Sequence, residues 1–364
     1  MFKRLALTTA VLAAVLPALP ASAQSNVTIY GLLDGAVEHY TNSNAAGQGV
    51  TRMPSLGGGM FPSRLGFRGT EDLGGGLKAI FALEDGVYLD TGMNGQNRLF
   101  GRQAWVGMAG TWGQVTIGRN YNMMTTSTYD FDLFGPSQYG VGSLDSFIPN
   151  GRSDNSVAYK GTFGGITAGA TYSLGRDTSA AGGPAGTNCA GESATDAVAC
   201  REWSAMLRYD APVFGVVAAY DRLYGGAGAS GGLTASSKND SRMHVAGLLK
   251  IDAWRIAGGA IIRNNEGNAT TPRSNLYYLG AAYKLTPQVT IDGQLGRLDY
   301  RNSGNDSNQL VLRAIYDFSK RTAVYFAGGR IDNHGAAALT LTAGGSVGAG
   351  LAQNGVIAGI KHSF

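Results

Sequence analysis

The sequence predicts an all-β protein, a transmembrane antiparallel β-barrel of 16 strands with a long third loop folded into the pore. Three observations support this prediction. Segments of alternating polar and apolar residues recur along the chain, short and long connections alternate between them, and no apolar run after residue 23 could form a transmembrane helix. Short turns at one end and long loops at the other are typical of outer-membrane barrels.

The chain begins with features of an export signal. Lys3 and Arg4 precede an apolar stretch that is too short to span a bilayer and ends before Pro17, and Ala21-Ser22-Ala23 follows as a small-residue cleavage site. This pattern predicts a secretory signal peptide over residues 1–23, cleaved after Ala23. A membrane anchor would need about 20 apolar residues.

Composition narrows the class of the remaining chain. Removal of the signal lowers the formal charge from +4 to +2, so no large basic footprint supports a nucleic acid as partner. A soluble chain of this size would usually divide into domains. We find no linker, low-complexity tract or shift of composition, and we therefore predict one barrel domain over residues 24–364.

The two cysteines lie in one connection rich in small residues. Cys189 and Cys200 belong to an exported chain, and disulfides persist in oxidising compartments. We predict that they form a loop-closing disulfide. Two cysteines without nearby histidines lack the ligands of a metal site, and we expect no metal or cofactor.

The first mature segment, residues 26–40, shows the strand pattern. Ile29, Leu33 and Val37 fall on one face, and Asp34 and Glu38 fall on the other. A period of two places the carboxylates opposite the apolar groups. A strand of a soluble sandwich could show the same pattern, so this segment alone does not distinguish a sandwich from a membrane barrel. The distinction rests on how the pattern repeats along the chain.

Fifteen further segments follow, and the connections between them alternate strictly between short and long. Such alternation predicts antiparallel neighbours with all long loops at one end. Closure into a barrel removes the unpaired backbone edges that lipid cannot satisfy, and 16 strands leave room for an aqueous channel. The predicted strands are residues 60–69, 77–88, 98–109, 113–121, 153–161, 166–174, 202–211, 215–224, 242–251, 255–264, 274–285, 289–301, 308–318, 322–332 and 355–364.

The longest connection that lacks a regular pattern, residues 122–152, holds several large apolar side chains and three carboxylates. A loop of this length is usually either functional or disordered. Phe131, Phe134 and Phe147 argue for packing, and strand-like segments flank the loop. We predict an ordered loop that folds into the barrel and narrows the channel.

These motifs together resemble the general diffusion porins of Gram-negative outer membranes, in the branch typical of beta-proteobacteria. The resemblance covers the mature chain and rests on residues 27–34, 63–79, 101–107, 116–119, 154–159, 285, 319–322 and 359–364. It implies a homotrimer in outer-membrane lipid and lipopolysaccharide, with the third long loop in each pore. It also implies that Phe364 is the terminal aromatic residue that the barrel-assembly machinery recognises.

The resemblance further implies a basic ladder on the barrel wall that faces acids on the loop. Arg64 and Arg68 share a strand face, and an arginine on the lipid face would cost about 2–4 kcal/mol. The alternatives are solvated arginines and loop-capping aspartates. The candidate pore-lining residues are Arg64, Arg68, Lys78, Glu84, Arg98, Arg102, Arg119 and Arg152 on the wall, and Asp130, Asp132 and Asp145 on the loop.

These features predict a water-filled channel for small hydrophilic solutes and inorganic ions. Fixed charge in a narrow passage concentrates the opposite ion, so more arginines than acids predict a mild anion preference. A substrate-specific anion channel with a saturable site and a plugged structural barrel remain alternatives. We do not predict an enzyme, because no histidine falls in a nucleophile motif: His39, His244, His334 and His362.

Overall fold

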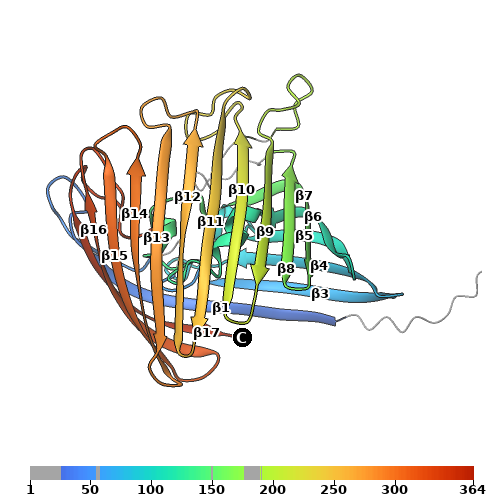
Figure 1. The fold of residues 1–364 in the computed structure, drawn as a ribbon, viewed down its shortest axis with the longest axis horizontal. Helices are drawn as coiled ribbons and strands as arrows, with labels where there is room; N and C mark the ends of the chain where they lie inside the picture. The colour runs from blue at the N-terminus through green and yellow to red at the C-terminus, as the bar shows by residue number, and fades with distance from the viewer. Residues whose placement is uncertain (1–25, 55–57, 149–150, 176–188, 190) are drawn as a thin grey trace, which may run out of the picture.

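The computed structural model describes residues 26–54, 58–148, 151–175, 189 and 191–364, and the predicted signal peptide lies outside them. Strands dominate the described chain (Figure 1). Their bounds are β1 Asn26–Tyr40, β2 Val50–Arg52, β3 Arg64–Gly74, β4 Leu77–Gly86, β5 Gln103–Gly110, β6 Gly113–Tyr121, β7 Arg152–Phe163, β8 Ile166–Ser173, β9 Glu202–Asp210, β10 Phe214–Tyr224, β11 Asn239–Ile251, β12 Trp254–Asn265, β13 Arg273–Lys284, β14 Val289–Tyr300, β15 Asp306–Asp317, β16 Thr322–Asn333 and β17 Gln353–Ser363.

Sixteen of these strands close into an antiparallel ring, which confirms the predicted fold class. From β3 onward each strand pairs with the next, and β17 pairs with β1, which in turn pairs with β3. The three-residue strand β2 is additional and pairs with the end of β1. In the front wall of Figure 1, β9 to β13 stand side by side, with long connections at the upper end and tight turns at the lower end.

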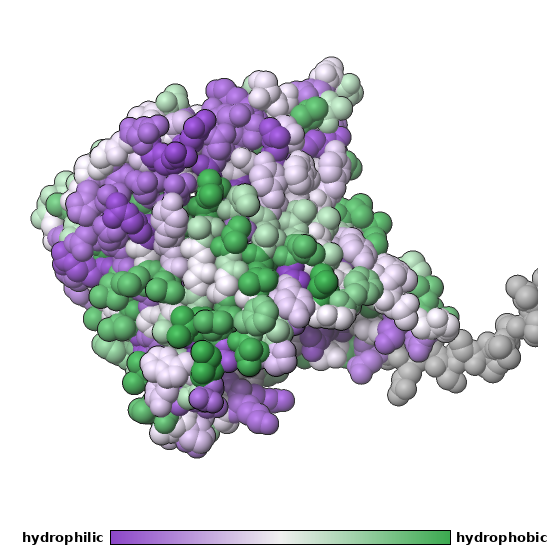
Figure 2. Space-filling view, in the orientation of Figure 1, coloured by the Kyte–Doolittle hydropathy of each residue, from purple (hydrophilic) through white to green (hydrophobic). Residues whose placement is uncertain are grey.

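The two faces of the wall differ as the alternation predicts. On β1, Ile29 and Val37 are more than half exposed, whereas Asp34 and Glu38 are buried inside the barrel. Figure 2 shows the resulting apolar area across the middle of the wall, with hydrophilic residues towards the end that carries the long loops. Within the described residues, no helix is long and apolar enough to cross a membrane.

One part of the wall turns inward, which corrects the predicted strand at residues 60–69. The strand there begins only at Arg64, because residues 58–63 leave the β1 edge and enter the lumen. The carboxylate of Asp34 accepts hydrogen bonds from the backbone N–H groups of Gly59, Met60 and Phe61 at 2.9–3.0 Å. These bonds satisfy donors that strand pairing leaves open.

The loop after β6 fills part of the lumen. It contains helix α1, Met123–Thr128, and a 3-10 turn η2, Val141–Ser143. Asn122 caps α1 by accepting a hydrogen bond from the N–H of Thr125 at 2.9 Å, the capping that asparagine favours. The loop's large apolar side chains join the buried cluster inside the barrel: Met123, Met124, Phe131, Phe134, Tyr139, Val141, Leu144, Phe147 and Ile148.

Polar contacts with the wall hold this loop at several points. Asn122 donates to Glu202 and Asp221 at 2.9 and 3.0 Å, and Ser127 bonds to His244 at 2.8 Å. These wall partners lie on β9, β10 and β11, so the first part of the loop is fixed against three adjacent strands.

Candidate functional site

A cavity of about 480 Å³ lies between the folded loop and the barrel wall. The wall contributes arginines and one glutamate, and the loop contributes two aspartates and a tyrosine. This cavity brings together several of the predicted pore-lining residues. Its polar and ionic lining residues are Arg64, Glu84, Arg102, Gln103, Tyr121, Tyr129, Asp130, Asp132, Arg152 and Arg255.

The wall side is built around Glu84 on β4. The Nε of Arg102 donates to its carboxylate at 2.7 Å, and the Tyr30 hydroxyl donates at 3.0 Å. The Nε of Arg64 lies 3.8 Å from the same carboxylate. Arg64 is paired with Gly86 on β4, which places its side chain on the lumen face beside Glu84.

Arg152 completes the basic cluster. Its Nη2 donates to the Tyr121 hydroxyl at 3.3 Å, and its guanidinium carbon lies 4.7 Å from the centre of the Tyr121 ring. The Nη2 of Arg102 donates to the same hydroxyl at 2.7 Å. Two guanidinium groups thus flank the Glu84 carboxylate, and Tyr121, whose hydroxyl lies 3.4 Å from that carboxylate, connects Arg152 to it. The excess positive charge of the three arginines favours anions nearby.

The loop side carries one exposed acid. The Asp130 side chain is about half exposed and pairs with Arg208 of β9 at 2.5 Å. Arg208 also binds Asp210 on its own strand at 2.6 Å. Asp130 therefore faces the cavity already paired with Arg208. The excess positive charge of the cavity lies on the wall, beside Glu84.

The other two predicted loop acids are bound by protein groups: Asp132 lines the cavity but is buried, whereas Asp145 is not part of its lining. Asp132 is buried and accepts hydrogen bonds from the backbone N–H groups of Phe134, Gly135 and Val141 at 3.0–3.2 Å. It is therefore a loop-capping residue, as the alternative interpretation expected.

Asp145 is buried against the wall. Its carboxylate accepts from the Nε and Nη2 of Arg242 on β11 at 2.8 and 3.2 Å. Arg242 also binds Asp240 at 3.0 Å and stacks over the Phe147 ring at 4.2 Å. Asp145 thus docks the second half of the loop onto the barrel.

The charge state of Asp145 gives a pH prediction. Burial raises the pKa of Asp145, but Arg242 and Arg263 outweigh burial and lower it to about 2. A free aspartate has a pKa of about 3.9, so the contribution to docking is complete above that value and is lost as the pH falls through about 2. We expect pepsin to cleave the loop slowly at pH about 4 and faster towards pH 2, relative to an unstructured peptide of the same sequence.

The Asp145→Asn variant is the control for this experiment. It lacks the titrating group, so its relative cleavage should be faster and nearly independent of pH over the same range. A wild-type rate that is already high at pH about 4 would contradict the assignment of the docking contact to the ionised pair.

Arg98 and Arg119, which are also predicted to line the pore, are not among the residues that line this cavity. The strand expected from residue 98 begins at Gln103, so Arg98 and Arg102 do not share a strand face. Arg98 pairs with Asp154 at 3.1 Å, and Arg119 pairs with the same carboxylate. The pairing of β6 with β7 is irregular at Arg119, and its largely buried side chain donates to the Gly101 carbonyl at 2.7 Å and to Gln96 at 2.9 Å.

Arg68 and Lys78 share the lumen-facing parity of Arg64 and Glu84 but lie away from the cavity. Arg68 is four residues beyond Arg64 on β3 and lies over the Tyr30 ring at 5.1 Å. Lys78 is near the turn between β3 and β4, six residues from Glu84, or about 20 Å along the strand.

Sequence reasoning did not select five residues that contribute to the site. Arg208 falls on the polar face of a predicted strand, two residues before Asp210, and that spacing was an available signal. Arg255, Tyr30, Tyr121 and Tyr129 showed no comparable signal, because each depends on partners distant in sequence.

Comparison with known proteins adds the family. A family model described as "Gram-negative porin" matches residues 8–336. The chain belongs to this family. It is 31% identical over 361 residues to outer membrane porin protein 32 of Delftia acidovorans, with 94% of this chain and 95% of that protein covered. The family assignment agrees with the predicted resemblance.

Solved porin structures share the fold. The anion-selective porin from Comamonas acidovorans matches with a TM-score of 0.76 and 25% identity, covering 94% of this chain and 100% of that one. The trimer form of the outer membrane protein OmpT of Vibrio cholerae matches with a TM-score of 0.61 and 16% identity, covering 93% and 99%. The second match concerns the fold alone.

The predicted disulfide is present in the connection between β8 and β9. Cys189 and Cys200 are both buried and bonded to each other, and a side chain on Gly226 would collide with their sulfurs. The bond therefore packs one long loop against the next one along the barrel.

We expect the Cys189→Ser, Cys200→Ser double variant to remain a folded barrel with a loosened loop. Closing a loop of this length stabilises it by about 3 kcal/mol in the chain-entropy model. Limited trypsin cleavage after Arg201 should accelerate, while the far-ultraviolet circular dichroism of the barrel stays unchanged. Loss of barrel structure would show that the disulfide is needed for the whole fold.

Phe364 lies at the seam of the barrel. Its backbone N–H donates to the carbonyl of Gly31 and its own carbonyl accepts from the N–H of Gly31, both at 3.1 Å. The ring remains 44% exposed. Gly31 is required beneath it, because a side chain there would overlap the ring.

Proposed function

We propose that this porin forms a water-filled channel in the outer membrane that passes small hydrophilic solutes and ions by diffusion, with a mild preference for anions. The observation that carries the proposal is the group of arginines on the wall of the cavity, with Arg64 and Arg102 paired with Glu84 and Arg152 bound to the neighbouring Tyr121. The anion-selective porin of the same fold supports the sign of the preference.

The residues of the cavity have distinct roles in this proposal. Arg64 is the most solvent-exposed member of the ion pairs with Glu84 and would meet the permeating ion directly. Arg102 and Arg152 would add to the field from behind it. Asp130 would mark the opposite side of the passage, and Arg68 and Lys78 would extend the basic surface along the lumen.

The processing and assembly of the chain are part of the same proposal. Residues 1–23 would be removed as a signal peptide, and the mature barrel would form a homotrimer, as the trimeric form of a porin-fold relative suggests. Contact with lipopolysaccharide and recognition of Phe364 by the barrel-assembly machinery would follow from the outer-membrane location. We propose no enzymatic activity and no cofactor.

The decisive experiment is a reversal-potential measurement on the purified full-length protein in a planar bilayer with a potassium chloride gradient. An anion-favouring potential supports the proposal. A cation-favouring potential would retain the channel but remove the role of the arginine cluster, and absence of current would reject diffusion. Saturable block by one solute would instead favour a substrate-specific channel.

A further inference from the structure

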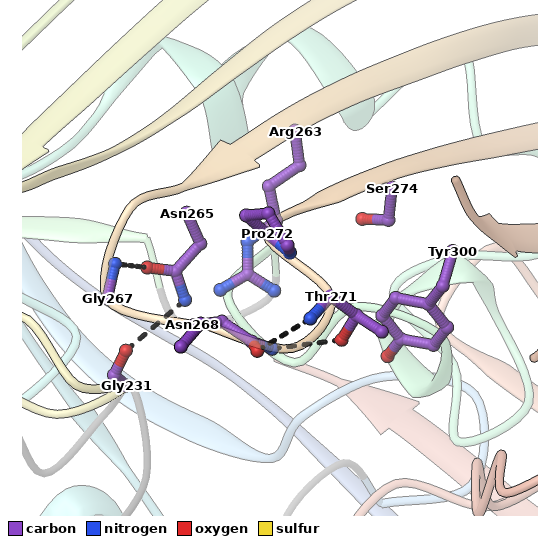
Figure 3. Close-up of a pocket in the computed structure, with 10 residues that line it drawn as sticks. Gly231, Arg263, Asn265, Gly267, Asn268, Thr271, Pro272, Ser274 and Tyr300 are labelled. Carbon is purple, nitrogen blue, oxygen red and sulfur yellow. Dashed lines mark hydrogen bonds between the residues drawn. The ribbon is translucent and has the colours of Figure 1, made fainter. Parts of the chain in front are cut away.

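A second cavity, of about 450 Å³, lies at the end of the barrel that carries the long loops (Figure 3). It is lined by the ends of β12, β13 and β14 and by the loop over residues 266–272. Gly231, from the loop after β10, closes one side. Its lining residues differ from those of the cavity beside Glu84.

Three lumen-facing side chains form a row across this cavity. Arg263 of β12 is paired with Ser274 of β13, and Ser274 is paired with Tyr300 of β14. Directly opposed residues of neighbouring strands hold their side chains about 5 Å apart. The strand register therefore places the three residues next to one another, and all three line the cavity.

The guanidinium of Arg263 is fixed on one edge and open on the other. Its Nε and Nη2 donate to the two oxygens of Asp240 at 2.9 and 2.8 Å. Asp240 also accepts from Arg242 at 3.0 Å, so its charge is shared between two arginines. A guanidinium has five N–H groups, and the three that remain on Arg263 form no hydrogen bond to another residue within the described chain. Arg263 is one of the residues that line the cavity (Figure 3).

The hydroxyl groups add further donors. Within the described part of the chain, neither the Ser274 hydroxyl nor the Tyr300 hydroxyl forms a hydrogen bond to another residue, although both line the cavity. The Tyr300 ring supplies an apolar surface beside them. A carboxylate fits the open edge of a guanidinium with two parallel hydrogen bonds, and a hydroxyl of the same solute can bond to Ser274 or Tyr300.

The rim of the cavity is held by its own hydrogen bonds. Asn268 accepts from the N–H of Thr271 at 2.9 Å and donates to its hydroxyl at 3.1 Å. Asn265 accepts from the N–H of Gly267 at 2.9 Å and donates to the carbonyl of Gly231 at 3.3 Å. A rim held in this way needs little ordering when a solute binds, which favours affinity.

We infer that this cavity is an entry site for small hydroxy acids, solutes that carry a carboxylate and neighbouring hydroxyl groups. Its volume lies in the range of small-molecule sites. The inference rests on the proposed channel function and adds a solute class to it. Solutes captured at this mouth would enter the lumen with their carboxylate already bound to arginine.

The test is a calorimetric titration of the purified full-length porin with sodium gluconate, at constant ionic strength and chloride concentration. Sorbitol is the matched neutral probe, because it has the same carbon chain without the carboxylate. We expect saturable binding of gluconate in the millimolar range and none of sorbitol. The Arg263→Gln variant should weaken binding about tenfold or more, the loss expected for a charged hydrogen-bonding group.

Additional variants keep the test decisive if Arg263→Gln disturbs Asp240. Tyr300→Phe and Ser274→Ala each remove one hydroxyl and leave the ion pair intact, and each should weaken binding about fivefold. Arg297→Gln on β14 is the control, because Arg297 binds Asn308 and Asp306 and is not part of the cavity lining. It should bind gluconate as the wild type does.

The inference is overturned if gluconate does not bind, if sorbitol binds equally well, or if the cavity variants bind unchanged. It is also overturned if binding survives Arg263→Gln but is lost in Arg102→Gln, because the site would then be the cavity beside Glu84. Chloride conductance of the same preparation separates the two proposals. A conducting porin without gluconate binding refutes only the entry site, whereas a non-conducting porin refutes the diffusion channel.

Discussion

Replacing Arg64 with glutamate should shift the channel from anion preference towards cation preference. The change moves two units of charge at the most exposed position of the Glu84 cluster. At about 5 Å in water, one unit charge alters the energy of a passing ion by about 0.8 kcal/mol, and salt reduces this to about half. Two units therefore change the chloride-to-potassium permeability ratio about fivefold or more.

The measurement is the reversal potential in a potassium chloride gradient, repeated at low and high salt. The shift should shrink at high salt because screening weakens the field. The matched control is Arg297→Glu, since Arg297 is half exposed and paired with Asp306 away from the cavity. Equal shifts in the two variants would show that the cluster has no special control over selectivity.

Replacing Arg242 with glutamine should release the second half of the folded loop. The Arg242 side chain is 1% exposed and binds both Asp145 and Asp240. Removing one partner of a buried ion pair costs about 3–5 kcal/mol because a buried charge is left unpaired. The population of undocked loop should rise about a hundredfold or more.

Two readouts distinguish this release from a general loss of stability. Single-channel recordings should show more frequent current fluctuations, and protease cleavage between residues 130 and 148 should accelerate. Arg330→Gln is the control, because Arg330 forms a half-exposed pair with Asp332, and such pairs contribute about 1 kcal/mol or less. A quiet channel in Arg242→Gln would contradict the docking role of the Asp145 contact.

Most of the wall could be predicted because each strand carries its own pattern. The alternation over residues 26–40 matches β1 at both ends, and the predicted order of short and long connections is the order in the structure. Local alternation suffices there because one face meets the lumen and the other faces outward.

The two wall segments that were wrong depend on partners far along the chain. Residues 58–63 leave the wall because Asp34 supplies hydrogen-bond acceptors for their backbone. Residues before Gln103 leave the strand where Arg98 and Arg119 share Asp154, which is 56 and 35 residues away from them. No local pattern shows which distant carboxylate a given arginine will bind.

The candidate site was likewise predictable only where local sequence determines the position of a side chain. Spacing placed Arg64 on the lumen face, and proximity to the loop identified Arg152 as a candidate. The composition of the loop could not predict which role each of its three acids would have. Asp130 faces the cavity, Asp132 caps the loop and Asp145 docks it, and the difference lies in whether backbone N–H groups or arginines meet each carboxylate.

The pairing of β1 with β17 sets a condition on assembly. Leu32 pairs with Ser363, so the seam joins the first and last strands of the chain. Because contacts between distant residues form slowly, closure is a late event. Until residues 353–363 arrive, β1 and β16 each present an unpaired edge, and such edges invite association with other strands. An unfinished chain therefore needs its free edges covered before it meets lipid.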